Sequence, residues 1–444
     1  MRRLRPEGVL VNDDYHALLA RREAMRLRDQ LLAPASRGAA AHSASYASPG
    51  PRTAASAPGA YDGAADQELI VRNLGLVTPF DALIAHLYDA MFERHPYLRK
   101  LFPESMEFQR AHLGRAFWYL IENLDRPEQV DAFCTRLGRD HRKLGVLPVH
   151  YEVFKVALEE ALQRYAGGRL GADVTDAWLR MVRFAAAGMV RGANEALAEP
   201  AYWTADVTRH ERRGRDVAVL RVRPSAPYPY RPGQYATLQS PLLPLTWRPY
   251  SMAGAPGGDG ELEFHIRRTG PDGVSDALVT DTGVGDTLRL GPAQGTTTLD
   301  GELTRDVLVV AGGTGWATAK ALLEDFAARR PPGRSAHLFL GARSADDLYD
   351  APALVRLESR CPWLRVVRVL DDGPGGSGGS GGSGHRSVVD APARHGDFGG
   401  HVAYVSGPPA MVTATAWHLS ALGLPPDLIR HDPVPDTSAP VHAR

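Results

Sequence analysis

Cysteine is almost absent from this chain: only Cys134 and Cys361 occur among its 444 residues. Two cysteines so far apart exclude a disulfide scaffold, a cysteine-rich zinc site and a cysteine-ligated iron–sulfur cluster within this chain. Net charge is absent too, because 51 basic residues balance 51 acidic ones. Without an overall electrostatic field, neither nucleic acid nor an anionic membrane surface is indicated as a partner.

Long apolar runs are also missing. No stretch reaches the roughly eighteen apolar residues that a membrane-spanning helix needs, and the basic N-terminus is not followed by the apolar core of a secretory signal. Together with the scarcity of cysteine, these absences predict a cytoplasmic protein that has no membrane partner.

The first 66 residues are rich in Ala, Ser, Arg, Gly and Pro, which separates them from the rest of the chain. A short helix is expected from Asp14 to Leu31. The segment from Ala33 to Ala65 has too little apolar surface to offset the entropy lost on ordering, so we expect it to be disordered. We assign no function to this extension.

Residues 67–200 show helical periodicity throughout, which predicts an all-α domain. One of the expected helices carries His141 in line with the apolar Val130 and Leu137, and ends before Gly145. A histidine on an apolar helix face is more often a hydrogen-bonded core residue than a metal ligand. Taken alone, His141 therefore leaves both interpretations open.

Near Ala201 the apolar pattern changes from helical to alternating. Short strands separated by Pro/Gly turns predict an antiparallel β-barrel over residues 201–302. Residues 303–444 alternate buried strands with helices, beginning with the strand Val307–Val310, which predicts a doubly wound α/β domain. Inside this domain, residues 373–384 form a Gly/Ser repeat that we expect to be a flexible loop.

A glycine turn follows the first of these buried strands and precedes a helix; it consists of Gly312, Gly313, Thr314 and Gly315. Glycines let the backbone approach a pyrophosphate, and the start of the helix supplies N–H donors. Tight strand-to-helix turns need glycine for conformational reasons as well. The strand–glycine–helix context nevertheless favours dinucleotide binding.

The expected barrel carries residue types that suit a flavin. Arg248 offers a charge to a phosphate, Tyr250 an aromatic face, and Ser251 a hydrogen bond to the edge of a ring. N–H groups at a strand-to-helix turn can meet a pyrophosphate. Such a turn is expected at Gly273, Val274 and Ser275.

In this order, and followed by the glycine turn, these motifs resemble the ferredoxin-reductase-like family, in which an FAD barrel precedes an NAD(P)H domain. Gly407 and Pro408 resemble that family's nicotinamide-site motif. The resemblance implies FAD and NAD(P)H as cofactors. Two positions depart from the family pattern: Ser406 replaces the usual cysteine, and Val434 replaces the aromatic residue that covers the flavin.

The preference between NADH and NADPH stays open. Arg343 and Ser344 follow the strand that ends at Leu340, where they are suited to hold a 2′-phosphate and so to favour NADPH. A solvated loop is an equally good interpretation of the same residues.

A helical domain ahead of such a reductase gives His141 a context. Residues 67–440 resemble the flavohaemoglobins, in which a globin is joined to a flavin reductase. The resemblance implies that His141 is the axial ligand of a haem b iron, with Tyr151 and Glu195 as its proximal hydrogen-bond partners. It further implies that Phe102 packs on the porphyrin. The residues implied to line the distal oxygen site are Tyr88, Gln109 and Leu113.

The chemistry of these residues is compatible with those roles. Neutral imidazole is a good ligand for haem iron, a carboxylate such as Glu195 would increase its electron donation, and the Tyr88 hydroxyl can stabilise developing negative charge. Each residue also has an ordinary interpretation: Tyr88 and Tyr151 as core aromatics, Gln109 as a solvated side chain, Glu195 as a charge at a helix end. The joint pattern favours the haem site.

Asp140, directly before His141, stands where the family usually has a basic residue. The resemblance implies that it would face the acidic Asp432, so that an ion pair between the domains would be missing.

The activity that the resemblance implies is that of an NAD(P)H-dependent nitric oxide dioxygenase. Electrons would pass from NAD(P)H through FAD to haem iron, and O2 bound there would convert NO to nitrate. We expect a monomer that requires no protein partner. Two alternatives stay open: a flavin reductase that serves a separate electron acceptor, and a non-enzymatic O2 or NO sensor that signals through residues 1–66.

Overall fold

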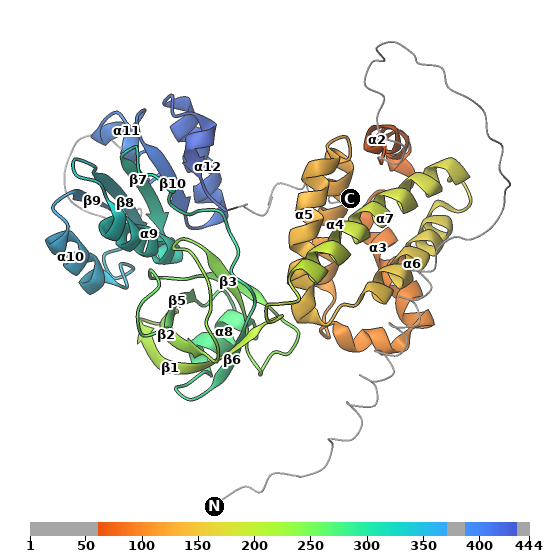
Figure 1. The fold of residues 1–444 in the computed structure, drawn as a ribbon, viewed down its shortest axis with the longest axis horizontal. Helices are drawn as coiled ribbons and strands as arrows, with labels where there is room; N and C mark the ends of the chain where they lie inside the picture. The colour runs from red at the N-terminus through yellow and green to blue at the C-terminus, as the bar shows by residue number, and fades with distance from the viewer. Residues whose placement is uncertain (1–60, 371–386, 433–444) are drawn as a thin grey trace, which may run out of the picture. The chain divides into compact units, whose positions relative to one another are not determined.

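The computed structural model describes residues 61–370 and 387–432, which form two compact units (Figure 1). One unit ends at Ala201 and the other begins at Tyr202. The helix expected from Asp14 to Leu31, most of the segment expected to be disordered, the Gly/Ser repeat and Val434 lie outside the described residues. Among the described residues, no helix is both long and apolar enough to cross a membrane.

The first unit is entirely helical, as predicted. Short 3-10 turns at Leu74–Leu76, Pro96–Leu101 and Arg142–Leu144 lie between its helices. In chain order the helices are α2 (Gly63–Arg72), α3 (Phe80–Arg94), α4 (Glu107–Asn123), α5 (Pro127–His141), α6 (Pro148–Ala166) and α7 (Ala172–Glu195).

Helix α2 begins earlier than the sequence predicts. Gly63 to Asp66, which were expected to belong to a disordered extension, form its first turn. Asp66 is only 4% exposed and accepts a hydrogen bond of 2.6 Å from Arg180 of α7. Because the two residues are 114 positions apart, local composition could not reveal the ion pair that holds this turn in place.

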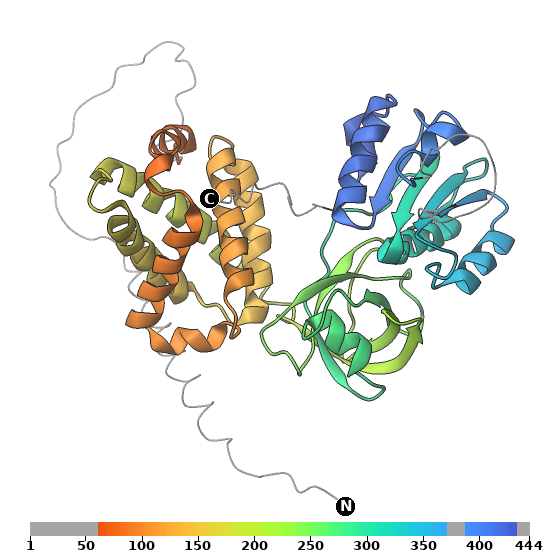
Figure 2. The ribbon, with the colours of Figure 1, turned by 180° about the vertical axis from the view of Figure 1, so that it is seen from behind.

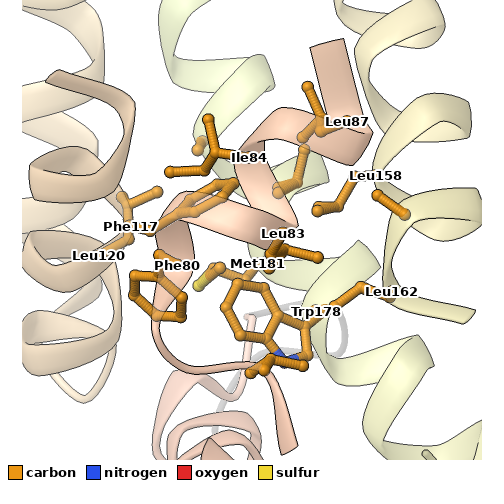
Figure 3. Close-up of a cluster of buried hydrophobic side chains, with 14 of the residues drawn as sticks. Phe80, Leu83, Ile84, Leu87, Phe117, Leu120, Leu158, Leu162, Trp178 and Met181 are labelled. Carbon is orange, nitrogen blue, oxygen red and sulfur yellow. The ribbon is translucent and has the colours of Figure 1, made fainter. Parts of the chain in front are cut away.

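The core of the helical unit is built around Trp178 of α7, whose ring is fully buried (Figure 3). The rings of Phe80 and Phe117 meet it edge-on, with centroids 6.0 and 5.6 Å away. Leu83 and Leu87 continue the apolar stripe of α3 and are also fully buried. Edge-to-face aromatic contacts add to the free energy gained by burial, so α3, α4 and α7 are joined mainly at this point.

Helices α5 and α7 touch at their backbones, because glycine faces the partner helix on both sides. A side chain at Gly138 of α5 would collide with the backbone of Met189, and one at Gly192 of α7 would collide with the backbone of Thr135. Gly138 lies three residues before His141. The close approach of these helices therefore fixes the end of α5 where the histidine lies.

The second unit begins with an antiparallel barrel. Its six-stranded sheet has the order β4-β3-β6-β1-β2-β5, and a bridge between Met252 and Phe264 joins the two edges. One short helix, α8 (Val274–Thr280), packs against β5. The strands are β1 (Trp203–Arg213), β2 (Val217–Pro224), β3 (Tyr235–Gln239), β4 (Arg248–Ser251), β5 (Leu262–Arg267) and β6 (Thr287–Leu290).

A parallel sheet with helices on its faces completes this unit; Figure 2 shows the ribbon from behind. Its strand order is β11-β10-β7-β8-β9, and apolar residues are buried on both faces, as in doubly wound folds. The strands are β7 (Val307–Gly312), β8 (Ala336–Ala342), β9 (Leu364–Leu370), β10 (Val402–Ser406) and β11 (Ile429–Arg430). The helices are α9 (Trp316–Arg329), α10 (Ala351–Arg360), α11 (Ala391–His395) and α12 (Pro409–Ala421).

The contact between α5 and α7 predicts how two glycine substitutions differ. Gly138→Ala should destabilise the helical unit by about 2 kcal/mol, because the added methyl group overpacks the contact. Gly114→Ala on α4 is the matched control, since its methyl group would lie 3.5 Å from Ile84, an ordinary contact. Alanine is the better helix former, so the control should be neutral or stabilising. Urea unfolding followed by far-UV circular dichroism measures both; equal stability of the two variants would contradict this packing.

Candidate functional site

His141 is the last residue of α5 and is partly buried. Its Nδ1 lies 2.8 Å from the carbonyl oxygen of Leu137, to which it donates a hydrogen bond. Burial lowers the pKa of His141, although the nearby Asp140 carboxylate and this hydrogen bond act in the opposite direction. The ring is therefore neutral near pH 7. Nε2 bonds to no residue that the structure describes, so its lone pair is available, which fits an axial haem ligand.

Tyr88 and Phe102 lie together in the helical unit. Tyr88, on α3, is 6% exposed, and the ring of Phe102 meets it edge-on at 5.5 Å. Burial raises the pKa of Tyr88 to about 12, although the charge of Arg110 opposes the shift. The phenol consequently keeps its proton at neutral pH and can donate a hydrogen bond.

Gln109 and Leu113 follow one another by one turn on α4. Leu113 packs against the same apolar core as Tyr88 and Phe102. The side-chain oxygen of Gln109 is buried and finds no hydrogen-bond partner among the described residues. A buried polar atom without a partner is uncommon in a folded protein. The amide oxygen is an acceptor, so only a group that donates a hydrogen bond would supply the missing partner.

Arg110 was missed by the sequence analysis. Its Nε is buried without a partner among the described residues, and its charge lowers the pKa of Tyr88. The only signal in the sequence is its position beside Gln109 in the first turns of α4. Arg110 adds positive potential to the region of the Tyr88 hydroxyl.

Tyr151 and Glu195, the two residues expected beside His141, differ in how far the structure buries them. Tyr151 of α6 is partly buried against the helical core, and burial raises its pKa to about 12. The side chain of Glu195 is 62% exposed, and its nearest cation is Arg191, at 4.0 Å. Among the described residues, Nδ1 of His141 bonds to the Leu137 carbonyl oxygen and not to Glu195. The proximal role expected for Glu195 stays a prediction.

Asp140 and Asp432 each have a partner within their own unit. The carboxylate of Asp140 binds Lys143 at 2.5 Å, and the Lys143 side chain is only 3% exposed. Asp432 accepts a hydrogen bond of 3.1 Å from the backbone N–H of Thr296. The absence of an ion pair between the domains stays a prediction from the sequence.

The residues expected to bind FAD lie on two elements of the barrel. Arg248, Tyr250 and Ser251 form β4, where Ser251 pairs with Tyr235 of β3. Tyr250 is partly buried, and burial raises the pKa of its hydroxyl, which therefore stays protonated. Strands β4 and β3 thus bring a cation, an aromatic face and a hydroxyl together, a set of groups that fits a flavin nucleotide.

The second flavin motif stands at the start of α8. Gly273 is its N-cap, and Val274 and Ser275 are buried in its first turn. The hydroxyl of Ser275 accepts a hydrogen bond from the Thr269 N–H at 3.2 Å. Its side chain therefore stabilises the preceding loop. A Cβ at Gly273 would meet nothing closer than the Pro271 carbonyl oxygen at 4.0 Å, so the backbone before α8 is open to a ligand.

The glycine turn after β7 packs against the turn after β10. Gly313 has a left-handed φ of 56°, which favours glycine. A side chain at Gly315 would collide with the Ser406 carbonyl group, so the backbones of the two turns touch. The hydroxyl of Ser406 donates to the Gly315 carbonyl oxygen at 2.8 Å. Ser406 thus holds the two turns together, with Thr314 in the first and Gly407 and Pro408 in the second.

A small cavity opens beside this turn, at the carboxyl ends of β7 and β8. Gly313, Trp316 and Gly341 are among the residues that line it. Ligands of doubly wound sheets bind at this edge, so the cavity lies where a dinucleotide is expected. Arg343 and Ser344 lie in the loop after β8, and both contact Asp347.

Glu263 of β5 connects the barrel to the parallel sheet. Its carboxylate lies 3.2 Å from the ammonium group of Lys320 on α9 and 3.1 Å from Nε2 of His265. The other nitrogen of His265 lies 2.8 Å from the Tyr349 hydroxyl. Burial alone would raise the pKa of Glu263, but the His265 hydrogen bond and the Lys320 charge hold it well below its usual range. This polar cluster fixes the flavin-binding barrel against the nucleotide-binding sheet.

Replacement of Glu263 tests that connection. Glu263→Gln should destabilise the reductase unit by about 3 kcal/mol at pH 7, because Lys320 and His265 lose a buried carboxylate. The folded-state pKa of Glu263 is lowered, so the difference is complete above the unfolded value of about 4.3 and shrinks as pH falls below it. Urea unfolding followed by tryptophan fluorescence between pH 3.5 and 7 measures the difference. The exposed Glu302→Gln is the control; a pH-independent difference would contradict the role of Glu263.

Comparisons with known proteins agree with this geometry. The globin family model matches residues 85–189, and the oxidoreductase NAD-binding domain model matches residues 309–416. The flavohemoprotein of Bacillus subtilis is 22% identical over 79% of this chain and 92% of that protein. The ferredoxin–NAD(P)(+) reductase component of the Pseudomonas putida naphthalene 1,2-dioxygenase system is 36% identical over 54% of this chain and 71% of that protein.

A solved structure shares the fold over most of the chain. The crystal structure of flavohemoglobin from Malassezia yamatoensis, with bound FAD and heme, matches with a TM-score of 0.66 at 18% identity. The match covers 83% of this chain and 98% of the other. At this identity the likeness shows a common fold.

The fold class expected from the sequence is confirmed: a helical globin, an antiparallel FAD barrel and a parallel NAD-binding sheet follow one another. Haem, FAD and NAD(P)H are the cofactors of this arrangement, and the chain is an oxidoreductase. The chain thus joins a globin domain to an oxidoreductase NAD-binding domain, and the relatives that match it across both units are flavohaemoglobins.

Proposed function

We propose that this chain is an NAD(P)H-dependent nitric oxide dioxygenase. The observation that carries the proposal is the presence in one chain of a globin pocket, with a neutral His141 and a protonated Tyr88, and a complete reductase. A hydride carries two electrons. One NAD(P)H therefore supports the oxidation of two NO by two O2 to two nitrate ions, with release of NAD(P)+ and one proton.

When bound, FAD converts the hydride into single electrons, and haem iron supplies the centre at which O2 reacts with NO. The neutral imidazole of His141 is the proposed axial ligand. Its Nδ1–H donates to the Leu137 carbonyl oxygen, which fixes the ring orientation and would leave Nε2 free to hold a haem iron. A single backbone carbonyl gives the imidazole less anionic character than a carboxylate would.

The distal residues supply positive potential without releasing a proton at neutral pH. The Tyr88 hydroxyl stays protonated and donates toward negative charge that develops during the reaction. Arg110 adds a fixed positive charge nearby. The Gln109 side chain offers a further polar group whose oxygen has no partner in the described protein. Phe102 and Leu113 line the same region with apolar surface and exclude water.

The reductase residues hold the two coenzymes in place. The turn at Gly312–Gly315 presents backbone N–H groups to a pyrophosphate, with Gly407 and Pro408 beside it. The Glu263–Lys320–His265 cluster keeps the barrel and the nucleotide-binding sheet at a fixed distance. Hydride transfer depends steeply on such positioning, so this cluster supports the electron path.

A second candidate is a reductase that serves a separate electron acceptor. The 36% identity to the naphthalene dioxygenase reductase component favours it, because that protein is named as the reductase component of a multicomponent system. Cytoplasmic location and function as a monomer stay predictions from the sequence.

Turnover of NO separates these candidates. The purified haem- and FAD-loaded protein should consume NO in air only when NADH or NADPH is supplied, and should form one nitrate for each NO. An NO electrode and nitrate analysis measure this. His141→Ala should lose the haem Soret band and NO consumption while it retains ferricyanide reduction. A wild-type protein without a Soret band would overturn the proposal in favour of the separate-acceptor reductase, and haem without turnover would favour a sensor.

Tyr88 gives a sharper test of the distal site. Tyr88→Phe should lower NO turnover on the order of 100-fold, because one donor to developing negative charge is removed. Haem content should not change, since the phenyl ring keeps the packing on Phe102. Tyr165→Phe, a partly buried tyrosine of α6, is the control and should retain full turnover. If Tyr88→Phe is as active as that control, the assigned role of Tyr88 is wrong.

A further inference from the structure

The loop after β8 contains the residues that would meet the adenosine ribose of a dinucleotide. In doubly wound folds the pyrophosphate lies at the glycine turn after the first strand, and the ribose is contacted by residues after the next strand. Here those strands are β7 and β8, neighbours in the sheet. The cavity beside Gly313 is lined by Asp347 and Asp350 of that loop. Two acidic residues therefore lie at the expected ribose position.

Asp347 binds the two side chains, Arg343 and Ser344, that could otherwise bind a 2′-phosphate. The Ser344 hydroxyl donates to one Asp347 oxygen at 3.0 Å, and the Asp347 N–H donates back to the same hydroxyl at 3.3 Å. The guanidinium of Arg343 lies 3.5 Å from the other oxygen. The two residues that sequence analysis associated with NADPH are thus both bound to a carboxylate, which would have to be displaced by a phosphate.

Other residues of the cavity reinforce this arrangement. The Asp350 carboxylate accepts a hydrogen bond of 2.8 Å from the Trp316 indole, which holds it at the cavity. Tyr349 also lines the cavity, but its hydroxyl is bound to His265. The side chain of Arg343 is 77% exposed, so solvent screens the positive charge that it could offer at the cavity. The charge that an incoming 2′-phosphate would meet is therefore mainly negative.

From this geometry we propose that Asp347 makes the chain selective for NADH over NADPH. The inference deepens the function proposed above and rests on it. A carboxylate accepts hydrogen bonds from the ribose hydroxyls of NADH. It repels the phosphate group of NADPH, which is doubly charged near neutral pH, and it withholds Ser344 and Arg343 from it.

Calorimetric titration of the FAD-loaded protein with ADP-ribose and 2′-phospho-ADP-ribose tests the selectivity without turnover. The wild-type protein should bind ADP-ribose at least about tenfold more tightly than it binds 2′-phospho-ADP-ribose. Asp347→Ser should reduce that ratio at least about tenfold, chiefly by a gain in affinity for the phosphorylated ligand, because Ser344 and Arg343 are released. Asp347→Asn, which keeps the shape of the side chain, should change the ratio in the same direction. The ratio of kcat/KM for NADH and NADPH should follow.

The matched control is Asp346→Ser, which removes the same charge from the exposed neighbouring position. It should leave the ratio unchanged. Equal shifts in the Asp346 and Asp347 variants, or tighter binding of the phosphorylated ligand by wild type, would overturn the selectivity while NAD(P)H-driven turnover still stood. Failure of wild type to bind either ligand would contradict the dinucleotide site itself, and with it the proposed function.

Discussion

The globin unit depends on the close approach of α5 and α7. Glycine at positions 138 and 192 lets the two backbones touch, and no larger residue fits at either position without moving a helix. His141 follows Gly138 by one turn, so the position of the imidazole is set by backbone contact. Backbone contact is stiffer than contact between flexible side chains.

In the reductase unit, direct backbone contact at a glycine also fixes the expected nucleotide site. The turns after β7 and β10 touch at Gly315 and Ser406, and the Ser406 hydroxyl bonds across the contact. A serine at this position has a clear structural role, whatever a thiol does there in relatives. The Glu263 cluster then holds this rigid nucleotide site against the flavin-binding barrel.

Much of the fold could be predicted from the sequence, because it depends on local patterns. The apolar stripe of α3, the buried strand β7 and the glycine turn all follow from the spacing of a few residues along the chain. The strand predicted at Val307–Val310 lies within β7 (Val307–Gly312) in the structure. Helix α2 could not be predicted in full, because the partner of Asp66 is Arg180, far away in the sequence.

The types of residue in the site could be predicted from the sequence, but the partners of their side chains could not. His141, Tyr88 and Gln109 have environments that fit their expected roles, although those roles stay predictions. The partners of Glu195, Asp140, Arg343 and Ser344 depend on where helices end and how loops turn, which spacing does not encode. Arg110 had no distinguishing pattern at all. Side-chain partners at helix ends and in loops are therefore the part of this site that only the structure reveals.

The most direct test of the account is whether NADH reduces the haem within a single chain. Anaerobic stopped-flow mixing of NADH with the haem- and FAD-loaded protein follows the shift of the Soret band from ferric to ferrous haem. The account predicts reduction at a rate that does not change with protein concentration, because the flavin and the haem belong to one molecule. Haem that stays ferric until a separate electron carrier is added would contradict it.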